Sequence, residues 1–257
     1  MIRLWYRVVA GGFAGALVVG SVSALPSTTH LRQVSGGSST ALAQAKAINM
    51  KVTDLTTTIK WATEQPSATP KGEAPLGKTA VACIAKGGPV SPDPFGTSGV
   101  TGGVVLVDNS SPTYFEKSAT LTHLPSASSE VVVLKTGAGA LADLGAVGRK
   151  ASLACLATQL AADSSLQGAG KGVKASATYM SAPHFGQGSG GVHIRFLESG
   201  GNLPAPLKIY DDVYDYVQGP AEVSLTFINL GSALSSASEA SAIAKVMARA
   251  KSAVGKG

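Results

Sequence analysis

The fold is decided by "PLKIYDDVYDYVQGPAEVSLTFINL", residues 206–230. Two runs rich in Val, Ile, Tyr, Phe and Thr, residues 206–217 and 221–230, stand on either side of a Gly-Pro pair. Side chains of these types favour strands, and Gly and Pro favour turns. A turn this short joins antiparallel neighbours, because parallel strands need a long crossover. The stretch therefore predicts an antiparallel hairpin.

Other segments extend this pattern in both directions. Apolar runs bounded by Gly, Pro or Asn predict strands at 118–124, 129–135, 172–181 and 191–199, and one short strand within the irregular segment 87–117. Apolar residues at helical spacing predict helices within 75–88, over 140–162 and at the C-terminal end, where Ser236 and Glu239 have capping-box spacing. Successive strands with short turns indicate a mainly antiparallel sheet, with helices packed on one face. The expected class is α+β.

The composition sets limits on the class of partner. The chain has 257 residues, 44% of them hydrophobic, which is enough for a sizeable core. Only 14% are charged, compared with about 25% in a typical soluble domain. The net charge is +6, but Lys and Arg are spread along the chain without interleaved aromatic residues. Nucleic-acid binding is therefore not predicted.

The N-terminal segment indicates export. Residues 1–24 have a basic start, an apolar run and an end typical of a signal-peptide cleavage site. An uncleaved membrane anchor is the alternative, because no charge occurs between Arg7 and Arg32. In both cases the basic start stays inside, so the domain is expected outside the cytoplasmic membrane. A flexible Ser/Thr/Gly-rich spacer is expected over 25–44, followed by one domain over 45–257.

The chain has two cysteines, Cys83 and Cys155. In an exported protein, such a pair predicts one disulfide. It would close a loop of roughly 70 residues, which the chain-entropy treatment values at roughly 4 kcal/mol. Two free buried thiols are one alternative, and a metal-binding or catalytic pair is another.

Two short motifs suggest a cofactor or catalysis, but both lack the necessary context. Residues 137–142 spell G-x-G-x-x-A after an apolar run, yet the next predicted strand carries no acidic residue and no alternating helices follow. Gly96-Thr-Ser98-Gly99 resembles the nucleophile turn of a serine protease, without a matching histidine neighbourhood. No cofactor and no catalytic residue are therefore predicted.

The densest acidic cluster is Asp211, Asp212 and Asp215. A calcium site needs oxygen ligands on a tight loop, whereas these residues lie on a predicted strand. The cluster therefore favours a solvated strand edge, and no metal site is predicted.

One face of the same strand is the candidate ligand-binding surface. Tyr210, Tyr214 and Tyr216 recur at even positions and so share a face. If strand 191–199 pairs with this strand, His193 and Arg195 lie nearby. Aromatic and polar groups mixed on one sheet face can bind a ligand. The alternative is the outer face of an amphipathic sheet.

A resemblance to a known family rests on the order of several segments. They are "DL" followed by Trp61, a helix with Cys83, "SSPTYF" (110–115), "VVVL" before a helix, "ASLACLATQL" (151–160), "IYDDVYDYVQGPAEVSLTFINL" (209–230) and a final helix ending in "VMARAK" (246–251). From about residue 50 to 252, the chain resembles the PknH-like extracellular sensor domain family of actinobacterial cell envelopes.

The resemblance implies an α+β domain with a cleft that binds an unidentified ligand, and it supplies no catalytic residues. This chain departs from the family's kinases, since it lacks a kinase domain, a lipid-anchor cysteine and a second cysteine pair. The expected function is an exported, non-enzymatic sensor-like or ligand-binding domain. Its partner would be a small molecule or an envelope component, and it would meet the membrane only through an uncleaved N-terminal segment. A secreted serine-type hydrolase and an extracellular protein-interaction module are the alternatives.

Overall fold

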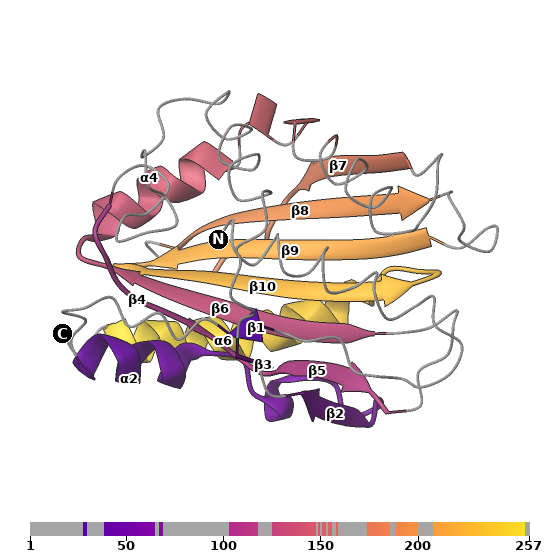
Figure 1. The fold of residues 1–257 in the computed structure, drawn as a ribbon, viewed down its shortest axis with the longest axis horizontal. Helices are drawn as coiled ribbons and strands as arrows, with labels where there is room; N and C mark the ends of the chain where they lie inside the picture. Colours follow the sequence, from indigo (N-terminus) through magenta and orange to yellow (C-terminus); the bar gives the residue numbers. More distant parts are fainter. Residues whose placement is uncertain are drawn as a thin grey trace.

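The computed structural model describes residues 28–29, 39–64, 67–68, 103–117, 125–147, 174–185, 189–199 and 208–254, and positions 149, 151–152, 154–155 and 158. Within them, eight strands form one sheet in the order β2-β5-β6-β10-β9-β8-β7, with β4 also paired to β6 (Figure 1). The strands are β2 (Trp61–Glu64), β4 (Val105–Ser110), β5 (Thr113–Glu116), β6 (Ser126–Leu134), β7 (Lys174–Met180), β8 (Ser189–Ser199), β9 (Lys208–Gln218) and β10 (Ala221–Leu230). All pairings in this sheet are antiparallel.

Three helices, a 3-10 turn and two short strands are the other elements with defined bounds, and the described positions 151–152, 154–155 and 158 are also helical. The helices are α2 (Ser39–Ile48), α4 (Gly137–Val147) and α6 (Ser236–Val254), and the 3-10 turn η1 is Val52–Asp54. The two-residue strand β1 (Thr28–Thr29) pairs in parallel with β3 (Ser67–Ala68). The predicted α+β class, with its mainly antiparallel sheet, is confirmed. None of the helices formed by the described residues is long and apolar enough to cross a membrane.

The predicted hairpin is β9 and β10, in the register that places Leu225 opposite Tyr214. Its turn includes Gly219 at φ 55°, a left-handed conformation that favours glycine. A Cβ at Gly219 would lie 2.5 Å from Val254 Cγ1 of α6, and a Cβ at Gly137 would lie 2.9 Å from the Gly219 carbonyl oxygen. The hairpin tip therefore touches the first residue of α4 and the last residue of α6.

The sheet has two different faces. On the face that we call the helix face, odd-numbered residues of β10 such as Val223 and Leu225 pack against α2 and α6. On the opposite face, which we call the α4 face, even-numbered residues such as Glu222 and Ser224 point toward the side of the sheet on which α4 lies. Helices α2 and α6, of which only α6 was predicted, form the helix layer on one face, and the shorter α4 covers part of the other (Figure 1).

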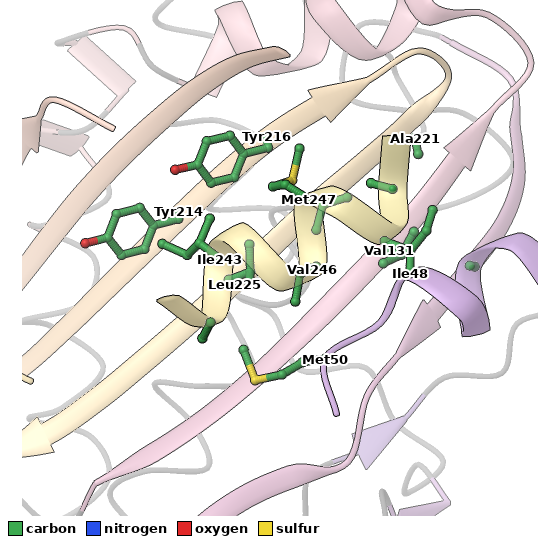
Figure 2. Packing of buried hydrophobic residues seen from close by; sticks show 14 of the residues in the cluster. Ile48, Met50, Val131, Tyr214, Tyr216, Ala221, Leu225, Ile243, Val246 and Met247 are labelled. Carbon is green, nitrogen blue, oxygen red and sulfur yellow. The ribbon is translucent and has the colours of Figure 1, made fainter. Parts of the chain in front are cut away.

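The hydrophobic core lies between the helix face and α6. Figure 2 shows Ile243, Val246 and Met247 of α6 above Leu225 of β10, with Ile48 of α2 at the side. All five side chains are at most 2% exposed. Burying an aliphatic side chain of this size contributes about 1.5–3 kcal/mol relative to exposure. The core therefore fixes α6 on the strands that carry the candidate site.

Several boundaries differ from the sequence-based prediction. Helix α2 begins at Ser39 and buries Ala41 and Ala45, so folded structure starts before the predicted domain boundary at residue 45. The segment looked like a spacer because its side chains are small and polar, but Ala favours helix strongly. Strands β2 and β5 were not predicted, and both are only four residues long.

The predicted capping box at the start of α6 is wrong. Ser235, not Ser236, is the capping residue, because its Oγ accepts a hydrogen bond from the Ser238 backbone N–H at 3.2 Å. The Glu239 carboxylate points to the sheet instead. The predicted helix 140–162 begins at Gly137, and its first regular segment ends at Val147.

Some predictions fall outside the described residues: the signal segment 1–24, the helix within 75–88, Ser98 and the strand 118–124. Cys83 is also outside them, so its disulfide with Cys155 stays a prediction. Cys155 itself is half-buried, and no described cysteine is free.

Candidate functional site

The pairing of β8 with β9 brings the predicted site residues together. His193 lies opposite Tyr214, and Arg195 lies opposite Asp212. Adjacent antiparallel residues point to the same face, so these four side chains meet on the helix face. The expectation that His193 and Arg195 lie beside the tyrosine-bearing strand is therefore confirmed.

Asp212 is the centre of this arrangement. Its Oδ1 is 2.8 Å from His193 Nε2 and accepts a hydrogen bond from Arg195 Nε at 2.7 Å. Arg195 Nη2 donates to the other oxygen, Oδ2, at 3.0 Å. The Asp212 side chain is 1% exposed, whereas that of Arg195 is 27% exposed. The hydrogen bonds that Arg195 donates to Asp212 raise the pKa of Arg195. A two-bond fork of this kind fixes the guanidinium plane.

Tyr214 connects this centre to helix α6. Its ring stacks on His193, with centroids 3.9 Å apart and planes 18° apart. Its hydroxyl donates to Glu239 Oε2 at 2.7 Å. Burial raises the pKa of Glu239 to about 7, with a further contribution from the Asp212 charge, against the effects of the Tyr214 hydrogen bond and of Arg195. We call these five residues, His193, Arg195, Asp212, Tyr214 and Glu239, the Asp212 network.

The other two predicted tyrosines lie at either side of the network. Tyr210 is half-buried, with the Arg195 guanidinium carbon 5.9 Å from its ring centroid. Tyr216 is 1% exposed and packs edge-to-face on Phe185 at 5.4 Å between centroids. The Tyr216 hydroxyl has no hydrogen-bond partner within the part of the chain that the structure describes, and burial raises its pKa. Only Arg195 and Tyr210 of the five predicted residues therefore approach solvent appreciably.

Two sequence-based interpretations are wrong here. The tyrosine-bearing face is not an outer sheet face, because Tyr214 and Tyr216 belong to the hydrophobic core (Figure 2). The acidic cluster is not a solvated edge, since Asp211, Asp212 and Asp215 are 8%, 1% and 0% exposed. Strand β9 is flanked by β8 and β10, so neither of its edges is open.

Sequence reasoning did not assign Asp212 or Glu239 to the site. Asp212 shares the period-two face with Tyr210 and Tyr214, so alternation indicated its orientation but not its partners. Glu239 precedes Ile243 by one helical turn and so lies on the buried stripe of α6. A carboxylate on an apolar stripe is the one sequence feature that indicated a buried polar contact.

A second polar cluster holds α6 through Lys245 and Arg249. Arg249 Nη1 donates to Asp54 Oδ1 at 2.7 Å, and its Nη2 donates to the Asn49 carbonyl at 3.0 Å. Lys245 Nζ donates to the Asp54 carbonyl at 3.1 Å. These bonds join α6 to the segment between α2 and η1, so their role is structural.

The chemistry of the Asp212 network resembles part of a hydrolytic triad. A triad needs an imidazole with one nitrogen on a carboxylate and the other on a nucleophile. His193 has the carboxylate, but no described serine, threonine or cysteine hydrogen-bonds to its ring. Among the described residues, no group of three His, Cys, Asp or Glu side chains could hold a metal ion.

Comparison with known proteins gives a distant likeness to a solved structure. No family model matches the chain, and no curated protein matches it. The crystal structure of the extracellular domain of PknH from Mycobacterium tuberculosis is similar at a TM-score of 0.43 and 10% sequence identity. That comparison covers 84% of this chain and 96% of the other.

Proposed function

We propose that this chain is an exported ligand-binding domain of the cell envelope without catalytic activity, and that it binds its ligand at the Arg195 end of the Asp212 network. The observation that carries the proposal is the Arg195–Asp212 fork, which is buried at its carboxylate and open at its guanidinium. The basic and apolar N-terminal segment supports a location outside the cytoplasmic membrane, either secreted or anchored.

The cost of the network supports a functional role. Apolar side chains of similar volume often stabilise a fold as well as a buried ion pair does. Here, β8 and β9 carry an imidazole, a guanidinium and a carboxylate in contact on a face whose neighbouring strand is apolar. Stability alone therefore does not explain why these three side chains are present. We therefore assign them to recognition.

The geometry favours a particular kind of ligand. Asp212 occupies Nε and Nη2 of Arg195, and Nη1 makes no hydrogen bond with a described residue. The half-buried Tyr210 ring lies beside this guanidinium. A ligand with a hydrogen-bond acceptor for Nη1 and a flat or apolar part for Tyr210 would use both groups.

The hydrolase alternative depends on the His193–Asp212 pair. In that reading, a nucleophile outside the described residues would complete the site. In the binding interpretation, His193 holds Asp212 and Tyr214 in place and transfers no proton. A protein-interaction module would use an exposed apolar surface instead, and no described feature of the Asp212 network supports it.

The test is native mass spectrometry and lipid extraction on protein purified from an exporting host. We expect a molecule that co-purifies with the unaltered chain and is lost from Arg195→Ala, while Arg195→Lys retains part of it. Lys251→Ala, which removes an exposed basic residue of α6, is the matched control and should retain the molecule. Circular dichroism checks that each variant is folded. Turnover of ester substrates that disappears in His193→Ala, with no co-purified molecule, would establish the hydrolase instead.

A further inference from the structure

The α4 face of the central strands is polar and buried. Strand β10 directs Glu222, Ser224 and Thr226 to this face, and Ser224 lies between Glu130 of β6 and Asp215 of β9. All five side chains are at most 4% exposed. A central strand normally buries apolar side chains on a covered face. The polar side chains on this buried face therefore need an explanation other than core packing.

Part of the hydrogen-bonding capacity here is used within the protein. Ser224 Oγ donates to Asp215 Oδ1 in a short hydrogen bond. Asp143 of α4 hydrogen-bonds to Glu222. Two carboxyl groups can share a hydrogen bond only when one of them carries a proton, so this pair is at most singly charged.

Other buried polar atoms on this face make no hydrogen bond with a described residue. No described residue hydrogen-bonds to three buried oxygens of this face, Asp215 Oδ2, Glu222 Oε1 and Thr226 Oγ1. We call these three residues the α4-face cluster. No described Lys, Arg or His forms an ion pair with Asp215 or Glu222. An unpaired buried polar group costs about 1–3 kcal/mol, and a charged one costs more. A ligand that donates hydrogen bonds to these three groups would therefore lower the free energy of the folded protein.

The charge of the cluster favours a cation. Burial raises the pKa of Asp215 to about 6 and the pKa of Glu222 well above its ordinary value. Asp215 is therefore largely ionised at neutral pH, and the positive charge of the chain's N-terminus favours the ionised form of both carboxyls. A positively charged donor that reached Asp215 would replace the solvation that burial removes.

The spacing argues against a bare metal ion. Asp215 and Glu222 are diagonal neighbours on adjacent strands, an arrangement that separates backbone positions by about 7–8 Å. No described set of three candidate ligands converges closely enough for a metal. A ligand that meets all three free oxygens must carry donors on more than one atom.

We infer that the α4-face cluster binds an organic cation, with an ammonium or amidinium group on Asp215 Oδ2 and further donors toward Glu222 Oε1 and Thr226 Oγ1. This site is independent of the proposed function, because the Asp212 network lies on the helix face. The two faces of one sheet would then bind ligands of different chemistry.

The test is isothermal titration calorimetry of the full exported chain with 1,4-diaminobutane and with glucosamine, near neutral pH. 1,4-Butanediol, which has a similar length and no charge, is the ligand control. We expect both amines to bind, the diol not to bind, and Asp215→Asn to weaken amine binding at least tenfold. Glu116→Gln neutralises a carboxyl on β5, which is separated from β10 by β6, and should leave amine binding unchanged.

Thr226→Val is a second, independent variant, because it preserves the side-chain shape and removes only the hydroxyl acceptor. It should weaken amine binding severalfold while unfolding like the unaltered protein. If Asp215→Asn does not fold, Thr226→Val decides the question. The inference is overturned if neither amine binds, if the diol binds as well as the diamine, if both cluster variants bind as well as the unaltered chain, or if Ca²⁺ binds and displaces the amines.

Discussion

Protonation of Glu239 should control stability between weakly acidic and weakly basic pH. The folded chain holds this carboxyl at a pKa of about 7, against an ordinary value of 4.5, chiefly because burial removes it from water. Between these two values, the folded state binds more protons than the unfolded state. Its stability therefore falls as pH rises through this window.

The magnitude follows from the two pKa values. Each pKa unit corresponds to about 1.36 kcal/mol, so the full difference is worth about 3 kcal/mol. Glu239→Gln removes the titration and keeps an acceptor for the Tyr214 hydroxyl. As the pH rises from about 5 to about 8, the free energy of unfolding of the unaltered chain should therefore fall by up to about 3 kcal/mol relative to that of the variant.

Urea unfolding at the two pH values measures this difference, provided that the slopes of the transitions agree. Asp215 titrates in the same direction, but it is present in both proteins and so cancels. A difference that does not change with pH would refute the reasoning. Such a result would show that Glu239 stays ionised in the folded chain throughout this pH range.

Other predictions concern single residues whose surroundings are equally well defined. Gly219→Ala should cost about 1–3 kcal/mol, because it combines a positive φ with a clash against α6. Gly145→Ala, in open space on α4, should stabilise by up to about 1 kcal/mol, and urea unfolding compares the two. Arg249→Ala leaves the buried Asp54 carboxylate with the Lys51 backbone N–H but without the Arg249 charge, and it should cost about 3 kcal/mol by the same measurement. The exposed Lys251→Ala should show no comparable loss. Non-reducing mass spectrometry of the exported chain should find no free thiol at either cysteine, and two alkylatable cysteines would exclude the disulfide.

The strands of the sheet were the most predictable part of the fold. The β9–β10 hairpin follows from a Gly-Pro pair between two runs of strand-forming residues, and alternation places Tyr210, Tyr214 and Tyr216 on one face. The approach of His193 and Arg195 follows from the pairing of consecutive strands. These inferences rest on neighbours in sequence, where local preference and final structure agree.

Burial was less predictable, because it depends on strand order and on which helix covers which face. Asp211, Asp212 and Asp215 looked like a solvated edge, and only the position of β9 inside the sheet makes them interior. The contact between Glu239 and Tyr214 joins a helix to a strand through tertiary packing that no local pattern specifies. Helix α2 was missed because its small and polar residues also suit a spacer.

The β9–β10 tip also limits how the molecule can be modified. Hairpin tips are usually the first choice for inserting an epitope or a fluorescent reporter, because loop tips tolerate added residues. Here, Gly219 lies against the first residue of α4 and the last residue of α6. An insertion at this tip would separate both helix ends from the sheet, and a tag fused directly after Val254 would crowd the same corner. Labels for this protein therefore belong elsewhere, or behind a spacer.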